Sequence, residues 1–297
     1  MGETIACANQ KGGVGKTTTV VNVGAFLALA GDRVLVIDLD PQGNATSGLG
    51  VDRSALDRSV YDAVMDLVPL ESLVRPTPVP GLHLVPAALA LAGAEVELAS
   101  IEQRERRLSR LIGAMADGYD YVFIDSPPSL GLLTVNALTA AGTVLIPIQC
   151  EYYALEGLTQ LIATVNLVRD HLNPRLGVKG VVLTMFDPRT NLSAQVSAEV
   201  RAHLGDAVYR TIIPRSVRLS EAPSYGLPIA LYRPDSKGAE AYRALADEIR
   251  ARDGRPGADA QHPDPHVEAA GSDGGVSLPA DAPETVGRPM TTAGLGS

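Results

Sequence analysis

The stretch Lys11-Gly12-Gly13-Val14-Gly15-Lys16-Thr17-Thr18 is the most informative part of this 297-residue chain. An apolar run at 4–8 precedes it, and a segment with helical periodicity at 17–30 follows it. Glycines between a strand and a helix let backbone N–H groups turn inward around phosphate oxygens, and the helix N-terminus adds its positive dipole. Lys16 can then reach the β- and γ-phosphates, while the Thr17 hydroxyl can bind Mg²⁺. The stretch therefore predicts a loop that binds a nucleoside triphosphate.

A second lysine sets this loop apart from the usual G-x-x-x-x-G-K-[ST] pattern. Where the pattern has its first glycine, this chain has Gln10, and Lys11 follows it. Lys16 serves the phosphates of its own subunit, so Lys11, on the stem of the loop, would more easily point away from them. A long cation in that position can neutralise charge on a nucleotide held by a facing subunit, as arginine fingers do. The alternative is that Lys11 is an ordinary solvated loop lysine.

Apolar runs typical of buried strands alternate with segments of helical periodicity along the chain. The expected strands are 4–8, 34–37, 82–85, 121–124, 144–148 and 181–185. The expected helices are 17–30, 94–116, 130–140, 155–171, 194–204 and 236–252. This alternation predicts an α/β fold with a doubly wound, mostly parallel sheet of the P-loop NTPase type. Functional residues should then gather at the carboxyl ends of the strands.

The composition indicates one large domain followed by a tail. We expect the domain to cover 1–253 and the tail to cover 254–297. The 44 residues of that tail include 8 glycines and 6 prolines and no aromatic residue. Such a segment cannot bury enough apolar surface to offset the entropy lost on ordering, so we expect it to be disordered.

Charge and cysteine content narrow the classes of protein that fit. The net charge is −9, yet residues 171–250 carry a net +3, which is compatible with a local face for nucleic acid. The two cysteines, Cys7 and Cys150, are expected in the core, and the absence of a CxxC motif argues against an iron–sulfur protein. No run approaches the roughly 18 apolar residues of a membrane span.

Three aspartates stand where strands are expected to end. Asp125 follows the four apolar residues 121–124, and there it could complete a Mg²⁺ site that Thr17 begins. A helix-capping role is the alternative for Asp125. Asp38 and Asp40 follow the second expected strand, two positions apart. An aspartate before proline, such as Asp40, is also a common turn former.

With these residues in view, the chain resembles the ParA/MinD group of P-loop ATPases, whose deviant Walker A signature is K-G-G-x-G-K-T-T. Further blocks resemble the ParA/Soj branch, and the resemblance extends from the first strand to about Arg250. The blocks are Asn9-Gln10, Asp38-Leu39-Asp40-Pro41-Gln42-Gly43-Asn44-Ala45-Thr46, Asp125-Ser126-Pro127-Pro128-Ser129-Leu130-Gly131, and the segments 185–192 and 213–226.

The resemblance implies an ATPase of weak intrinsic activity that uses ATP and Mg²⁺. The catalytic residues it implies are Lys11, Lys16 and Asp40, with Asp40 acting on the attacking water, and the metal site would comprise Thr17, Asp38 and Asp125. The nucleotide would be bound by Lys11, Gly12, Gly13, Val14, Gly15, Lys16, Thr17, Thr18, Met185, Pro214, Arg215 and Ser216. The family often has asparagine where this chain has Ser216.

The resemblance also implies partners. Two ATP-bound subunits would form a homodimer that binds double-stranded DNA without sequence preference, through Arg189, Arg215 and Arg218. A ParB-type centromere-binding protein would stimulate hydrolysis, and the protein would reside in the cytoplasm in association with the nucleoid. The tail lacks the basic amphipathic helix of MinD-like proteins, so no stable membrane association is expected.

Three alternatives stay open on the sequence alone. The first is a MinD-like ATPase that works on a membrane surface. The second is a metabolic P-loop enzyme or a metallocluster carrier of the same superfamily, and the third is a scaffold that does not hydrolyse nucleotide. The absence of cysteine ligands disfavours the carrier, and the presence of Lys16 and Asp40 disfavours the scaffold.

Overall fold

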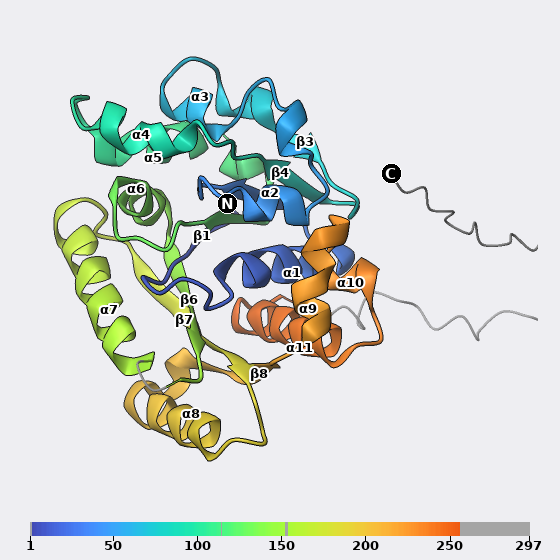
Figure 1. Cartoon of the computed structure of the whole chain (residues 1–297). Coiled ribbons are helices and arrows are strands. Elements are labelled where there is room, and N and C mark those ends of the chain that lie inside the picture. The colour runs from blue at the N-terminus through green and yellow to red at the C-terminus, as the bar shows by residue number, and fades with distance from the viewer. Residues whose placement is uncertain (1, 114, 152–153, 256–297) are drawn as a thin grey trace, which may run out of the picture. The chain divides into compact units, whose positions relative to one another are not determined.

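A single sheet of eight strands organises the chain in the computed structural model, which describes residues 2–113, 115–151 and 154–255 (Figure 1). The strand order is β3-β4-β2-β5-β1-β6-β7-β8, and every neighbouring pair is parallel except β3 with β4. The strands are β1 (Glu3–Cys7), β2 (Val34–Asp38), β3 (Arg75–Pro76), β4 (Leu82–Val85), β5 (Tyr121–Asp125), β6 (Thr143–Gln149), β7 (Gly177–Phe186) and β8 (Val208–Pro214). The predicted doubly wound fold is confirmed.

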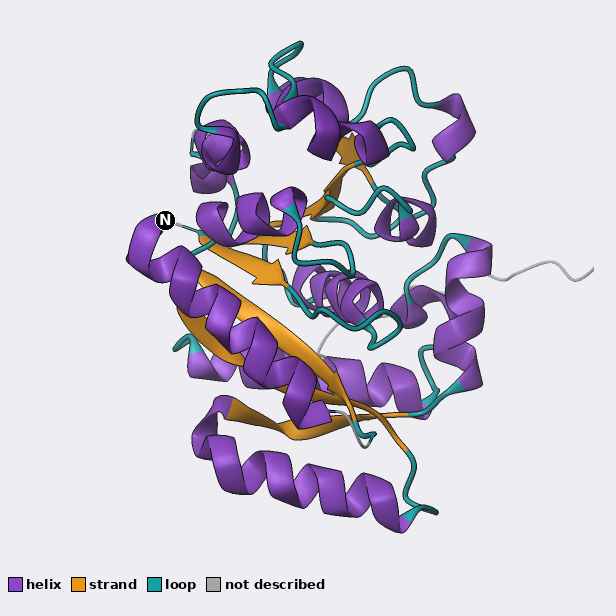
Figure 2. Cartoon of the chain, turned by 60° about the vertical axis from the view of Figure 1, so that its left-hand side comes forward, coloured by secondary structure: helices purple, strands orange, loops and turns teal. Residues whose placement is uncertain are grey.

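Helices cover both faces of this sheet and bury an apolar core on each (Figure 2). One face holds α1 (Lys16–Leu29), α2 (Asn44–Gly48), α9 (Val217–Glu221), α10 (Ile229–Tyr232) and α11 (Lys237–Arg252). The other holds α3 (Val60–Val64), α4 (Leu91–Leu98), α5 (Arg107–Ile112), α6 (Leu132–Ala140), α7 (Ala154–His171) and α8 (Asn191–Leu204). Within the described residues, no helix is both long and apolar enough to cross a membrane.

The structure differs from the expected elements in both helices and strands. The short helices α2, α3, α9 and α10 were not expected from the sequence. The helix expected over 94–116 is wrong, because α4 and α5 are separate helices and Gln103 between them adopts a left-handed backbone with φ 54°. Strands β3 and β8 were not expected from the sequence. Both lie at edges of the sheet, where residues such as Arg210 face solvent and interrupt the apolar pattern.

The predicted tail, 254–297, lies outside the described residues except for Gly254 and Arg255. These two residues continue from α11, and Arg255 is held at the base of the sheet by two carboxylates described below.

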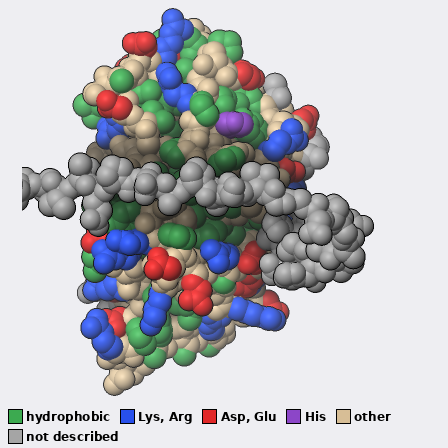
Figure 3. All heavy atoms as spheres, turned by 90° about the vertical axis from the view of Figure 1, so that its right-hand side faces the viewer, with side chains coloured by type: hydrophobic (Ala, Val, Ile, Leu, Met, Phe, Trp, Pro, Cys, Tyr) green, Lys and Arg blue, Asp and Glu red, His purple; other side chains and the backbone are tan. Residues whose placement is uncertain are grey.

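The surface on the side of α9 and α10 carries charges of both signs (Figure 3). In the lower half of that view, Lys and Arg side chains are interspersed with Asp and Glu. This lower part of the face is therefore not a continuous basic patch.

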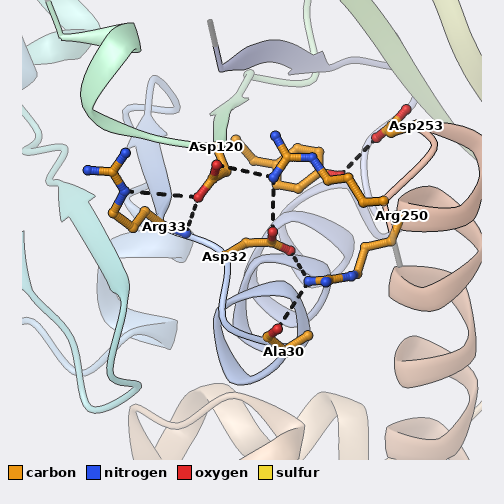
Figure 4. Close-up of polar contacts among 8 residues, drawn as sticks. Ala30, Asp32, Arg33, Asp120, Arg250 and Asp253 are labelled. Atoms are coloured by element: carbon orange, nitrogen blue, oxygen red, sulfur yellow. Dashed lines mark hydrogen bonds and ion pairs between the residues drawn. The ribbon is translucent and has the colours of Figure 1, made fainter. Parts of the chain in front are cut away.

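An ion network ties α11 to the amino ends of the strands (Figure 4). Asp32, in the turn before β2, accepts from the buried Arg250 of α11 and, at 3.0 Å, from Arg255. Arg250 also donates to the carbonyl of Ala30, and Arg255 lies 3.1 Å from Asp120, which precedes β5. The network thus joins the last helix to two turns that are distant in sequence.

Because Asp32 is buried, we expect Asp32→Ala to lower the free energy of unfolding by about 3 kcal/mol, since the Asp32 carboxylate that pairs with the buried Arg250 charge would be removed. Urea denaturation measures this difference. The matched control is Asp170→Ala, which removes an exposed partner of Arg169 and should cost less than about 1 kcal/mol. Equal losses in the two variants would contradict a structural role for the buried network.

Candidate nucleotide and metal site

The predicted phosphate loop connects the end of β1 at Cys7 to the first residue of α1, Lys16. Gly13 and Gly15 have φ of 73° and 87°, a backbone region that favours glycine. The side chain of Asn9 anchors the stem by donating to the carbonyl of Pro147 at 2.7 Å. The loop therefore has the left-handed turns that direct backbone N–H groups toward a bound anion.

The two lysines of the loop use their ammonium groups on different partners. Lys16 is buried and its Nζ donates to the carbonyl of Lys11 at 3.2 Å, across the loop. Burial lowers the pKa of Lys16, and the nearby charges of Asp125 and Asp40 oppose this effect. The Nζ of Lys11 instead lies 2.8 Å from Oε2 of Glu151, which follows β6, and this pair is exposed. Glu151 was not among the residues predicted for the site.

The residues predicted to hold Mg²⁺ meet at the carboxyl ends of β2 and β5. Asp38 and Asp125 lie side by side in register, and Thr17 Oγ1 donates to Asp125 Oδ2 at 2.7 Å. The other oxygen of Asp125 is buried and has no hydrogen-bond partner in the described part of the chain. Burial and the neighbouring Asp38 charge raise the pKa of Asp125 well above its usual range. An unpartnered buried carboxylate oxygen beside a hydroxyl fits Mg²⁺, which binds few protein ligands when phosphates supply the others.

Both carboxylate oxygens of Asp38 accept hydrogen bonds from neighbouring residues of the chain. Its Oδ2 accepts from the backbone N–H of Thr46 at 2.8 Å and from the Thr46 hydroxyl at 2.6 Å, and its Oδ1 accepts from the N–H of Asp40 at 3.2 Å. Burial raises the pKa of Asp38 to about 6, although the hydrogen bonds from Thr46 oppose the shift. Asp38 therefore fixes the segment after β2, and its place in the metal site stays a prediction.

Asp40 stands beyond the end of β2, in a turn that it helps to close. Its Oδ1 accepts from the N–H of Gln42 at 2.9 Å, and its carbonyl accepts from Gly43 at 2.8 Å. The side chain is buried, and its second oxygen makes no hydrogen bond with the described residues. Because β2 ends at Asp38, Asp40 lies outside the strand.

A cavity of about 270 Å³ adjoins the phosphate loop and brings the predicted base-binding residues together. Met185 and Pro214 stand at the ends of β7 and β8, and Met185 has a φ of 52°, a strained conformation for a residue with a side chain. Gly15 and Thr18 of the loop complete the junction with the phosphate site. The lining residues are Gly15, Thr18, Thr184, Met185, Ile213, Pro214, Arg215, Ser216, Leu219, Ser220, Pro223 and Tyr242.

Of the three arginines predicted to bind DNA, Arg189 and Arg218 each form an ion pair with a carboxylate. The backbone of the third, Arg215, adjoins the loop that carries Arg189. Arg189 is 84% exposed and makes a bidentate contact with Asp187, which lowers the pKa of that carboxyl to about 2. The N–H of Arg215 donates to the carbonyl of Phe186 at 3.0 Å, so its backbone adjoins the Asp187 loop. Arg218, in α9, contacts Glu221 at 2.7 Å.

Thr46, Thr184 and Glu151 were missed by the sequence reasoning. Thr184 donates to the carbonyl of Val14 and so supports the loop from β7. The contacts of Thr184 with Val14 and of Glu151 with Lys11 join residues that are distant in the chain, and the contact of Thr46 with Asp38 depends on a turn. The one available signal was the position of Thr46 within the block that follows Asp38.

The chain is similar to a known protein family and to proteins of known name. A family model described as an AAA domain matches residues 2–178. The sporulation initiation inhibitor protein Soj of Bacillus subtilis is 57% identical over 251 residues, which cover 84% of this chain and 99% of that protein. The chromosome partitioning protein ParA of Myxococcus xanthus is 53% identical over 253 residues, covering 85% of this chain and 89% of that protein.

Solved structures share the fold. Cobyrinic acid a,c-diamide synthase from Mycobacterium smegmatis, with bound ADP and magnesium, is 40% identical with a TM-score of 0.74, covering 86% of this chain and 97% of that one. The septum site-determining protein MinD from Pyrococcus horikoshii, complexed with Mg-ADP, is 25% identical with a TM-score of 0.71, covering 86% and 98%.

The Thr46 hydroxyl donates to Asp38 and accepts from the N–H of Ala87 at 2.9 Å, all within the core. Thr46→Val keeps the shape but removes both hydrogen bonds, so we expect the free energy of unfolding to fall by about 2 kcal/mol. Chemical denaturation provides the measurement. Thr159→Val, on the exposed side of α7, is the control and should change stability by less than about 0.5 kcal/mol. A Thr46 variant as stable as this control would show that the anchor is dispensable.

Proposed function

The chain belongs to the ParA/Soj family of chromosome-partitioning ATPases, and from this membership we propose that its ATP-bound form is a homodimer that holds DNA until hydrolysis. The chain is an ATPase that uses ATP and Mg²⁺. The proposal takes residues 1–253 as the ATPase domain and 254–297 as a Gly/Pro-rich tail. The separate positions of the two loop lysines are the observation that carries the proposal.

Lys16 alone faces the interior of the phosphate loop, where its buried ammonium can bind the β- and γ-phosphates of the same subunit. Among the described residues, the Lys11 ammonium pairs with Glu151 alone, in an exposed contact of small net energy that a stronger anion can replace. In the proposed dimer, Lys11 exchanges Glu151 for the phosphates of the facing subunit. Loss of the γ-phosphate then weakens the interface, and the dimer separates.

Within one subunit, the residues have separate roles in hydrolysis. Thr17 and Asp125 would hold Mg²⁺, which when bound neutralises charge on the phosphates. The free oxygen of Asp40 would orient the attacking water, while Asp38 fixes the backbone around it. Met185, Pro214 and the backbone near Ser216 would enclose the base in the adjoining cavity.

DNA binding would use the arginines at the carboxyl ends of β7 and β8. Arg215 is exposed and makes no side-chain ion pair within the described residues, whereas Arg189 and Arg218 are held by Asp187 and Glu221. Phosphates must therefore displace these carboxylates, which favours weak single contacts that become useful in a dimer. We further propose that a ParB-type partner stimulates hydrolysis and that the protein associates with the nucleoid.

The greater identity to Soj and ParA favours partitioning over the activities named for the structural neighbours. Soj of Bacillus subtilis is 57% identical over nearly its whole length, against 40% for the cobyrinic acid a,c-diamide synthase and 25% for MinD. A lipid-vesicle assay in parallel with the DNA assay separates the partitioning role from a MinD-like role.

We expect Lys11→Ala to abolish ATP-dependent dimerisation while leaving ATP affinity unchanged, because in the proposed dimer Lys11 contacts the phosphates of the facing subunit, and the exposed pair with Glu151 that is also lost contributes little. Light scattering with ATP and Mg²⁺ measures the dimer, and titration with a fluorescent nucleotide measures affinity. Lys237→Ala, an exposed lysine in the first turn of α11, is the matched control. A Lys11 variant that dimerises like the wild type would contradict the role of this lysine across the interface.

The DNA assay compares ATP with ADP on duplexes of arbitrary sequence at increasing salt. We expect the protein to be retained on DNA only with ATP. Replacing Arg189, Arg215 or Arg218 by alanine should weaken DNA binding equally on all sequences. Each replacement should also reduce the slope of log affinity against log salt concentration by about 1. Arg175→Ala, in the exposed turn before β7 at the opposite end of the sheet, is the control. Vesicle binding without DNA binding in either nucleotide state would overturn the partitioning proposal.

A further inference from the structure

Arg53 lies against the turn that carries Asp40. It begins the short 3₁₀ turn Arg53–Ala55, which follows α2, and its side chain is half-buried. The Nη2 of Arg53 donates to the carbonyl of Pro41 at 3.3 Å. The residue next to Asp40 is therefore contacted from outside the turn by a cation that is distant from the phosphate loop in sequence.

The contact extends to Gly43, at the other end of the same turn. Gly43 has a φ of 59°, and a Cβ added to it would lie 2.6 Å from Arg53 Nε and 2.9 Å from Arg53 Cδ. The stem of the arginine therefore occupies the space that any side chain at 43 would need. Glycine at this position permits both the left-handed turn and the close approach of Arg53.

No ion pair explains why an arginine stands here. Within the described residues Arg53 contacts no carboxylate, and its Nε is buried without a hydrogen-bond partner. A buried unpaired donor is unfavourable for stability. Such a feature is more readily explained by function than by folding, because strain and unsatisfied groups gather where geometry serves a reaction.

We propose that Arg53 is a positioning residue for ATP hydrolysis, which holds the turn 40–43 so that the free oxygen of Asp40 keeps its direction. This inference rests on the proposed role of Asp40 in orienting the attacking water. Arg53 acts through the Pro41 carbonyl and the backbone of Gly43, and it does not itself contact the nucleotide. Small displacements of a catalytic group cost large factors in rate, so a support at both ends of the turn has a measurable effect.

The first test separates turnover from binding. We expect Arg53→Ala to lower kcat by about tenfold or more while KM and the affinity for a fluorescent ATP analogue stay within about twofold of the wild type. Arg53→Lys keeps a donor for the Pro41 carbonyl but loses the planar contact with Gly43. Its kcat should therefore lie between those of the wild type and Arg53→Ala. Arg58→Ala, exposed on the same loop, is the matched control and should hydrolyse ATP normally. Thermal unfolding establishes that each variant is folded.

The second test uses the contact with Gly43. A methyl group at 43 must displace Arg53, so Gly43→Ala should lower kcat in the same way, and the double variant should be no slower than the slower single one. Arg53→Ala with a wild-type kcat, parallel loss of nucleotide affinity, or additive losses in the double variant would overturn the inference. A wild-type protein without ATPase activity would instead refute the proposed function.

Discussion

The burial of Asp38 and Asp125 beside each other is the constraint on which the molecule depends. Parallel pairing of β2 with β5 puts both carboxylates at one edge of the sheet, where desolvation and mutual repulsion disfavour their charges. Thr17, Thr46 and Lys16 compensate in part, through hydrogen bonds and a nearby positive charge. The remaining imbalance would be relieved by a divalent cation, as in the proposed Mg²⁺ site, and the same strand pairing that builds the fold creates it.

Much of the fold was predictable because parallel strands buried on both faces consist of continuous apolar runs. The runs that became β1, β2, β4, β5, β6 and β7 were all recognised, and the aspartates at their ends could be placed near one another. Strand β8 was not predicted because an edge strand mixes buried residues such as Tyr209 with exposed ones such as Arg210. The break at Gln103 escaped because its left-handed backbone has no glycine to indicate it.

The site was predictable in its residue types but not in its partners. Spacing indicated the phosphate loop and the strand-end carboxylates, since each follows a strand directly. The pairing of Lys11 with Glu151, and of Asp38 with Thr46, results from how distant segments fold together. Pattern reasoning therefore finds the groups that act on a ligand more readily than the groups that hold them in place.

The network around Asp32 also bears on how the protein can be labelled. Arg255, the last described residue, is fixed to Asp32 and Asp120 at the amino ends of the strands, whereas the phosphate loop lies at their carboxyl ends. A fluorophore or affinity handle joined just after Arg255 would start on the side of the sheet remote from the nucleotide. The attachment point itself is therefore remote from the phosphate loop.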